Sequence, residues 1–129
     1  MYLLDTNAVI NYLDATLPAR AMQFMGTIVD SNCNISVITK METLGFAFKS
    51  MAEQRTMETF VSGSNVLVIN DEIVDKTITI RKIKKIKLPD AIIAATALVY
   101  GFILISRNTS DFVNIQHLHV IDPYRTTDF

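Results

Sequence analysis

The sequence predicts a three-layer α/β/α domain with a central, mainly parallel sheet of about five strands. Short apolar runs alternate along the chain with longer segments in which apolar residues recur at helical spacing. Strands that alternate with helices are joined by crossover connections and pair in parallel between two layers of helices. The chain has 129 residues, of which 50% are hydrophobic, and only 4 Gly and 3 Pro interrupt it. One core without linkers is therefore expected, and residues 1–129 are predicted to form a single domain.

Five short apolar runs are the predicted strands. The run from Val66 to Ile69 lies between Asn65 and Asn70 and contains only β-branched residues and leucine, which is typical of a strand buried on both faces. The first run closes with the helix-capping sequence Asp-Thr-Asn. The predicted strands are residues 1–5, 33–36, 66–69, 102–105 and 120–121.

Helical spacing of apolar residues marks the segments between these runs. Residues 91–100 are apolar on nearly all sides, which is typical of a central helix that packs against several neighbours, and Gly101 ends this helix. The polar segment 106–111 is expected to be a loop. The predicted helices are residues 8–13, a segment after Pro18 that ends near residue 30, a segment from residue 37, residues 51–62, a segment from residue 71, and residues 91–100.

Composition excludes several classes of protein. The formal net charge of −1 does not favour a polycation that binds nucleic acid with its whole surface, and no apolar stretch approaches the roughly 18 residues of a membrane span. The chain contains one cysteine, Cys33, so an intramolecular disulfide framework and a cysteine-based zinc cluster are excluded. The N-terminal residues lack the features of a secretory signal, and the cytoplasm is the expected location.

Common cofactor and hydrolase motifs are absent. The sequence has no G-x-G-x-x-G, no G-x-x-x-x-G-K and no G-x-S-x-G. His117 and His119 are two residues apart, which suits neither a zinc pair on a helix nor a catalytic couple with cysteine. Cys33 adjoins an apolar strand without a basic neighbour and is expected to be a small buried hydrophobe. Carboxylates remain as the candidate functional groups.

Four carboxylates stand where predicted strands end or helices begin. Asp5 closes the first strand, Glu42 lies in the helix after the second, Asp90 precedes the most apolar helix, and Asp111 follows the fourth strand. In a parallel sheet the carboxyl ends of the strands lie along one edge, so these side chains are expected to converge there. Each also has a structural explanation, with Asp5 and Asp90 as helix caps and Glu42 as a solvated helix residue.

Converged carboxylates must bind protons or cations because like charges repel. A site of oxygen donors without His or Cys suits Mg²⁺ or Mn²⁺. Water on such an ion is a nucleophile for a phosphodiester, so the predicted chemistry is metal-dependent phosphodiester hydrolysis. Among the four acids, Glu42 is the favoured acceptor of a proton from the attacking water.

The motifs that carry these acids resemble those of PIN-domain nucleases, and within that family those of the VapC-type toxins of toxin–antitoxin pairs. Taken in order, they span essentially the whole chain. They are Leu4-Asp5-Thr6-Asn7, Glu42, Leu-Pro-Asp-Ala-Ile-Ile-Ala-Ala at 88–95, and Ser-Arg-Asn-Thr-Ser-Asp-Phe at 106–112.

The resemblance implies a fold, an activity and partners. The fold is a five-stranded parallel sheet between helices, and the activity is cleavage of RNA by an endonuclease. The implied partners are a second copy of the chain in a homodimer and a cognate antitoxin that holds the nuclease inactive. Asp5, Glu42 and Asp90 correspond to the three acidic positions of the family's metal site.

The fourth site position has two candidates. Some members of the family carry an acid where this chain has Asn108, and others rely on the acid before the phenylalanine, here Asp111. Asn108 can hold water or phosphate but brings no charge, so Asp111 is favoured as the fourth carboxylate with Asn108 in support. By the same resemblance, Thr6 and Ser106 supply hydroxyl groups that orient carboxylates or water.

A basic segment lies immediately before Asp90 and leaves the rest of the chain acidic. Lys84, Lys85 and Lys87 are candidates for contact with RNA, because lysine side chains can extend from a packed helix toward phosphate. The alternative is the solvated end of an amphipathic helix, where cations suit the helix C-terminus. The basic residues are Arg81, Lys82, Lys84, Lys85 and Lys87.

Three functions remain open on these grounds. The first is a Mg²⁺- or Mn²⁺-dependent endoribonuclease that is the toxin of a type II toxin–antitoxin pair. The second is a PIN nuclease that processes RNA or acts on DNA. The third is a PIN-like fold retained as a non-catalytic binding module, against which the retained acids argue.

Overall fold

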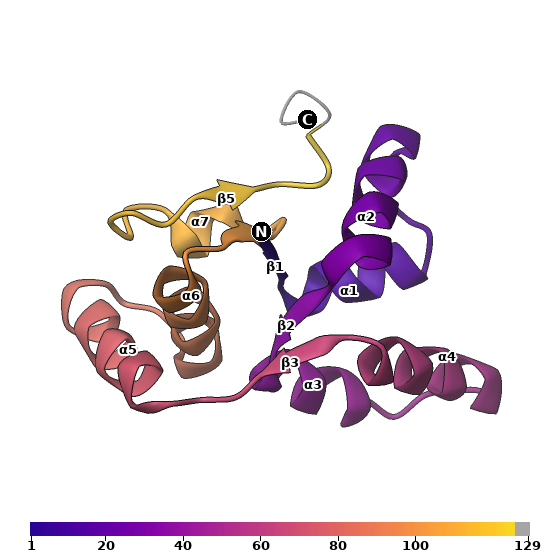
Figure 1. Ribbon diagram of the computed structural model, residues 1–129, viewed down its shortest axis with the longest axis horizontal. Coiled ribbons are helices and arrows are strands. Elements are labelled where there is room, and N and C mark those ends of the chain that lie inside the picture. The colour runs from indigo at the N-terminus through magenta and orange to yellow at the C-terminus, as the bar shows by residue number, and fades with distance from the viewer. Residues whose placement is uncertain (126–129) are drawn as a thin grey trace.

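The computed structural model describes residues 1–125, and the last four residues of the predicted domain, 126–129, lie outside this description. Five short strands form one sheet with helices on both faces (Figure 1). In the described part, no helix has the length and apolar character needed to cross a membrane. The strands are β1 (Tyr2–Leu4), β2 (Asn34–Ser36), β3 (Asn65–Leu67), β4 (Ile103–Ile105) and β5 (Val120–Ile121). The helices are α1 (Thr6–Leu13), α2 (Ala19–Asn32), α3 (Val37–Leu44), α4 (Met51–Ser62), α5 (Asp71–Ile83), α6 (Leu88–Tyr100) and α7 (Thr109–Phe112).

The strands pair in parallel in the order β3-β2-β1-β4-β5. The central strand β1 aligns Leu3 with Asn34 of β2 and with Leu104 of β4. The chain adds β2 and β3 on one side of β1 and then β4 and β5 on the other, so the strand order changes direction between β1 and β4. The predicted α/β/α fold is confirmed, and every pair in the described sheet is parallel.

Successive strand residues face two separate apolar cores. Leu3 and Leu104 face the core that α5, α6 and α7 share, whereas Leu4, Ile35 and Ile105 face the core of α1, α2 and α4. Figure 1 shows α5 and α6 on one side of the sheet and α1 and α2 on the other. Because helices cover both faces, a ligand can approach the strands only at their ends.

The third strand differs from its prediction. β3 ends at Leu67, and the next two residues, Val68 and Ile69, are 64% and 40% exposed. Burial on both faces was therefore wrong for this run. The reason is position: β3 is an edge strand that pairs only with β2, and an apolar run does not reveal whether its strand lies at the centre or the edge of a sheet.

Three boundaries near the candidate acids also differ. α1 begins at Thr6 rather than residue 8, and α6 begins at Leu88 rather than residue 91, with Pro89 in its first turn. Asp90 therefore lies inside the first turn of α6 and does not cap it. The segment 106–111, predicted as a loop, contains the start of α7.

Candidate functional site

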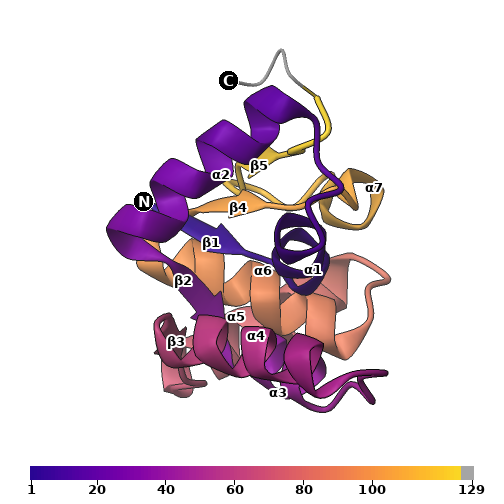
Figure 2. The ribbon, with the colours of Figure 1, turned by 90° about the vertical axis from the view of Figure 1, so that its right-hand side faces the viewer.

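The site lies where β1 and β4 end side by side, next to the starts of α1 and α7 (Figure 2). Asp5 directly follows β1, and its backbone N–H donates to the Ile105 carbonyl at 3.1 Å. Its carboxylate caps α1 by accepting a hydrogen bond from the Ala8 N–H at 2.8 Å. This contact holds the Asp5 side chain at the change of strand order, which is where open α/β sheets bind ligands.

Asp5 is 6% exposed, and its pKa is raised to about 6. Burial is the largest cause, since it removes water from the ionised carboxylate. The negative charges of Asp90 and Glu42 raise the pKa further, whereas hydrogen bonds from Ser106 and Ala8 lower it. Three acids, one directly after β1, one in α3 and one in α6, are thus close enough to influence one another.

Glu42 of α3 is held by a pair of threonines. The Thr6 hydroxyl donates to Glu42 Oε1 at 2.5 Å, and the Thr6 and Thr39 hydroxyl oxygens are 3.2 Å apart. A hydroxyl has one proton, so when Thr6 donates to the ionised glutamate, the second contact has Thr39 as donor. Thr39 is fully buried in α3, so this chain of hydroxyls ties the exposed Glu42 carboxylate to the protein core.

Asp90 is partly buried in the first turn of α6, and its pKa is raised. Burial is again the largest cause, followed by the negative charges of Asp111 and Glu42. The positive charge of Lys87 acts in the opposite direction. Asp90 therefore interacts electrostatically with Asp5 and Glu42 and also with Asp111 of α7.

The segment after β4 brings the remaining predicted residues to the same edge. The hydroxyl of the buried Ser106 accepts a hydrogen bond from the Asn108 N–H at 3.0 Å. The Asn108 side-chain amide in turn donates to the Asp111 carboxylate. Asn108 and Asp111, the two candidates for the fourth position, are thus bonded to each other.

A small cavity of about 120 Å³ lies between these elements. Three of the four predicted acids line it, and at the fourth position the lining residue is Asn108, which is hydrogen-bonded to Asp111. The fold thus brings Asp5, Glu42 and Asp90 to one cavity. At the fourth position, the Asn108 amide lines the cavity and the Asp111 carboxylate accepts a hydrogen bond from it. The lining residues are Asp5, Thr6, Asn7, Glu42, Asp90, Ile93 and Asn108.

The chemistry of these donors fits a hard divalent cation. The polar groups of the cavity are carboxylate, hydroxyl and amide oxygens, which Mg²⁺ and Mn²⁺ prefer. Within residues 1–125, no three His, Cys, Asp or Glu side chains stand close enough together to hold an ion as they are. The Glu42 carboxylate is bonded to Thr6 and the Asp111 carboxylate to Asn108, so both would have to turn away from these partners to become ligands.

Most of this chain matches a known protein family. The family model of the PIN domain matches residues 2–118. The chain belongs to the PIN domain family. Among curated protein sequences, no significant match is found.

Solved structures agree with this assignment. A chain of a toxin–antitoxin complex from Klebsiella pneumoniae is 33% identical, with a TM-score of 0.78, and the match covers 97% of this PIN domain chain and 99% of that chain. DNA-bound VapBC from Salmonella typhimurium is 28% identical with a TM-score of 0.78 over 95% and 97% of the two chains. VapBC-1 from nontypeable Haemophilus influenzae is 28% identical with a TM-score of 0.77 over 96% and 98%. The predicted resemblance to VapC-type PIN domains is confirmed.

The basic segment of this PIN domain divides into residues with different surroundings. Lys87 precedes α6, and its charge acts on Asp90. The Lys84 ammonium donates to the Val113 carbonyl at 2.8 Å, so it anchors the end of α5 to the segment after α7. Lys85 is exposed and lines a groove of about 700 Å³ along α5. Of the three lysines predicted to contact RNA, Lys87 is the one next to the acids.

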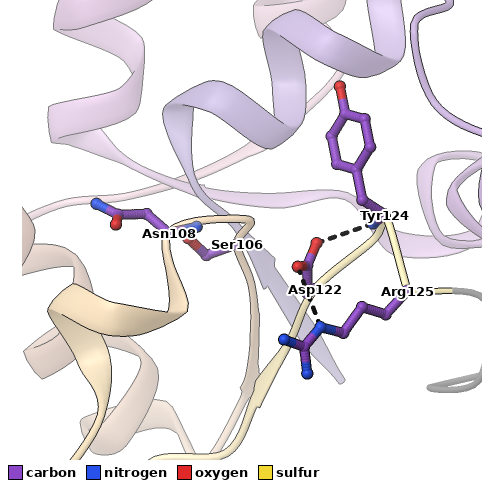
Figure 3. A network of polar contacts seen from close by, with 5 residues as sticks. All are labelled: Ser106, Asn108, Asp122, Tyr124 and Arg125. Carbon is purple, nitrogen blue, oxygen red and sulfur yellow. Dashed lines mark hydrogen bonds and ion pairs between the residues drawn. The ribbon is translucent and has the colours of Figure 1, made fainter.

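Sequence reasoning missed two polar residues of this edge. Thr39 lies three residues before Glu42 on α3, and helical spacing could have placed the two on one face. Asp122 follows β5 just as Asp5 follows β1, and it is only 9% exposed. The rule that selected Asp5 selects Asp122 as well once it is applied to the last strand. Figure 3 shows Asp122 beside the segment with Ser106 and Asn108.

Proposed function

We propose that the chain is a Mg²⁺- or Mn²⁺-dependent endoribonuclease and the toxin of a type II toxin–antitoxin pair. The observation that carries the proposal is the small cavity in a PIN domain that Asp5, Glu42 and Asp90 line together. The raised pKa values of Asp5 and Asp90 support it, because they indicate carboxylates that a cation would stabilise in their ionised forms.

Each residue of the cavity has a role in this proposal. Asp5, fixed by the Ala8 N–H, and Asp90 would hold the ion, with Asp111 reaching it through a rotation away from Asn108. When bound, the ion supplies a water of lowered pKa and offsets the charge that develops on the phosphodiester. Glu42, oriented by Thr6, accepts a proton from the attacking water. The Asn108 amide is a donor for a phosphate oxygen.

Positive charge near the acids favours a nucleic-acid substrate. Lys87 lies beside Asp90, and Lys85 is exposed on the same connection between α5 and α6. These two lysines are the proposed contacts to the RNA backbone. Lys84 holds the start of their connection in place through its bond to the Val113 carbonyl. Binding of RNA should therefore weaken as the salt concentration rises.

The proposed partners are an antitoxin and a second copy of the chain. The antitoxin is inferred from the solved relatives, which are toxin–antitoxin complexes at 28% identity or more. The second copy is supported by apolar side chains that are exposed along α3, the connection after β3, and α5, which we call the α3–α5 face. It consists of Met41, Leu44, Val68, Ile69, Val74 and Ile78.

Cleavage assays on matched variants test the nuclease. Asp5→Asn and Asp90→Asn should each abolish Mn²⁺-dependent cleavage of RNA while the circular dichroism spectrum and thermal unfolding show an intact fold. Glu58→Gln, which removes an exposed acid of α4, should cleave at the wild-type rate. Undiminished cleavage by both aspartate variants would overturn the assignment of the site.

Binding of the metal separates the nuclease from a non-catalytic module. Calorimetric titration with Mn²⁺ should give heat and thermal stabilisation with the wild type and with Glu58→Gln, and neither with Asp90→Asn. Absence of both signals in the wild type would favour a PIN-like binding module.

Expression in cells separates the toxin from a nuclease that processes RNA or acts on DNA. Wild-type expression should arrest growth and reduce intact RNA, and Asp90→Asn should do neither. Co-expression of a small protein encoded beside this gene should restore growth. Normal growth, or arrest that no neighbouring gene relieves, would contradict the toxin assignment, and cleavage of DNA in place of RNA would contradict the proposed substrate.

A further inference from the structure

Arg107 occupies a distinctive position at the edge of the site. In the sequence it lies between Ser106, whose hydroxyl is hydrogen-bonded to Asp5, and Asn108, which lines the cavity of the acids. Its side chain is exposed, and its guanidinium carbon lies 4.0 Å from the centre of the Tyr124 ring. Within residues 1–125, no carboxylate forms an ion pair with this guanidinium, so its N–H donors have no charged partner.

The ring beneath Arg107 is itself held in place. The Tyr124 N–H donates to Asp122 Oδ1 at 2.9 Å, and the Tyr124 hydroxyl lies 3.4 Å from the Thr16 hydroxyl after α1. Figure 3 shows Asp122 between Tyr124 and Arg125, with Arg125 on its other carboxylate oxygen at 3.8 Å. Tyr124 is thereby fixed from both ends, to the end of β5 and to the end of α1.

This arrangement restricts the arginine without neutralising it. Contact with an aromatic face limits the positions that the guanidinium samples and leaves the N–H groups at its rim available. Planar guanidinium groups of this kind bind phosphate through paired hydrogen bonds. Tyr124 also lies outside the stretch 2–118 that matches the PIN domain model, so the support for Arg107 comes from a part of the chain beyond that match.

Charge explains why such a group is needed here. The acids of the cavity repel the phosphates of an approaching RNA, and a bound divalent ion offsets only the charge at the cleaved bond. Lys87 provides a positive charge beside Asp90 on the α6 side, and Arg107 provides one on the β4 side. The two cations thus come from different segments, one before α6 and one after β4.

We propose that Arg107, held against Tyr124, binds a phosphate of the RNA backbone next to the cavity of Asp5, Glu42 and Asp90. The proposal rests on the RNA nuclease function proposed above. Tyr124 is a positioning residue, because it acts on RNA only through Arg107. Asp122 and Thr16 position Tyr124 in turn.

Salt-dependent binding tests the proposal. In the Asp90→Asn background, a fluorescein-labelled single-stranded RNA of mixed sequence is titrated by anisotropy in Mg²⁺ over a series of KCl concentrations. Arg107→Ala should weaken binding and make the slope of log K against log salt shallower by about 0.7, the value for one lost phosphate contact with a single strand. Arg107→Lys keeps the charge and should keep the slope.

Tyr124→Leu separates positioning from charge. It should weaken binding by about two- to fivefold, the loss expected for an exposed contact between a cation and an aromatic ring, without changing the salt slope. Combined with Arg107→Ala, it should cause no further loss. Arg55→Ala, which removes an exposed cation of α4, should match the parent in affinity and slope.

The outcomes distinguish this inference from the function on which it rests. If the parent binds RNA and the wild type cleaves it, but Arg107→Ala behaves as Arg55→Ala does, the inference is overturned and the nuclease stands. Additive losses for Tyr124→Leu and Arg107→Ala would overturn the positioning role. If the wild type neither binds nor cleaves RNA, the function and the inference both fail.

Discussion

Asp5 has two roles that favour opposite protonation states of its carboxyl group. As the N-cap of α1 it must present a carboxylate oxygen to the Ala8 N–H, which favours the ionised form. As a buried residue beside Asp90 and Glu42 it is more stable when protonated. The second effect is larger, since the pKa lies near 6 rather than at the ordinary 3.8. A buried carboxyl group with a pKa raised in this way is typical of a functional site.

The raised pKa of Asp5 predicts a stability that falls with pH. Between pH 3.8 and about 6 the folded chain retains the Asp5 proton that the unfolded chain releases, so the free energy of unfolding decreases as the pH rises through this window. Across the whole window, the free energy of unfolding falls by on the order of 2–3 kcal/mol. Asp5→Asn should therefore be more stable than the wild type in urea unfolding at pH 7.5 and about equally stable at pH 4.

Glu58→Gln is the control for this effect, because Glu58 is exposed on α4 and does not line the cavity of the acids. Its difference in stability from the wild type should be small at both pH values. A constant difference between Asp5→Asn and the wild type across the pH range would show that Asp5 ionises freely in the folded chain.

At the scale of elements, α6 sets the position of Asp90. The helix begins with a proline in its first turn and ends at Gly101, whose φ of 69° is the left-handed conformation that closes many helices. The Gly101 N–H bonds to the Leu98 carbonyl, and the next N–H, of Phe102, bonds to the Ala97 carbonyl. These contacts turn the chain directly into β4, next to β1.

Gly101→Ala should destabilise the fold by about 1–2 kcal/mol, because a side chain disfavours the left-handed conformation even though space is open around the position. Urea unfolding measures the loss. Gly63→Ala is the matched control, since Gly63 ends α4 with a φ of −85° and a Cβ there would meet only ordinary contacts. Equal losses in the two variants would show that the conformation of Gly101 is not the cause.

At the scale of the whole molecule, the two cores leave apolar side chains of the α3–α5 face exposed, and we propose that a second copy of the chain covers them. Figure 1 shows α3 and α5 on either side of the connection that follows β3, and this connection carries Val68 and Ile69. Exposed apolar patches are typical of interaction surfaces.

Val68→Asp should convert a homodimer into a monomer, because it places a charge in the α3–α5 face where a second copy would exclude water. Light scattering during gel filtration measures the mass, and circular dichroism should show an unchanged fold, since Val68 is 64% exposed. Val113→Asp, at a 53% exposed residue after α7, should remain a dimer. A monomeric wild type, or a dimeric Val68→Asp, would contradict the proposed interface.

Local sequence was sufficient for most of the elements. The alternation of apolar runs and helical spacing predicted the parallel sheet, because such a pattern buries its apolar side chains only between two layers of helices. The same logic placed Asp5 at the edge of the sheet. Two failures were local: Pro89 started α6 earlier than expected, and a short helix replaced part of the predicted loop at 106–111. The failure at β3 was not local, because it came from the position of this strand at the edge of the sheet.

Tertiary structure decided what depends on contacts between distant residues. The sequence determined which residues are acidic and which follow strands, and parallel pairing then brought Asp5, Glu42 and Asp90 to one cavity. Sequence could not show that Asn108 lines this cavity and bonds to Asp111, nor that the Tyr124 ring contacts Arg107, seventeen residues away. Periodicity reports which side of an element is apolar, whereas the direction of a polar side chain is set by hydrogen bonds and charges from other elements.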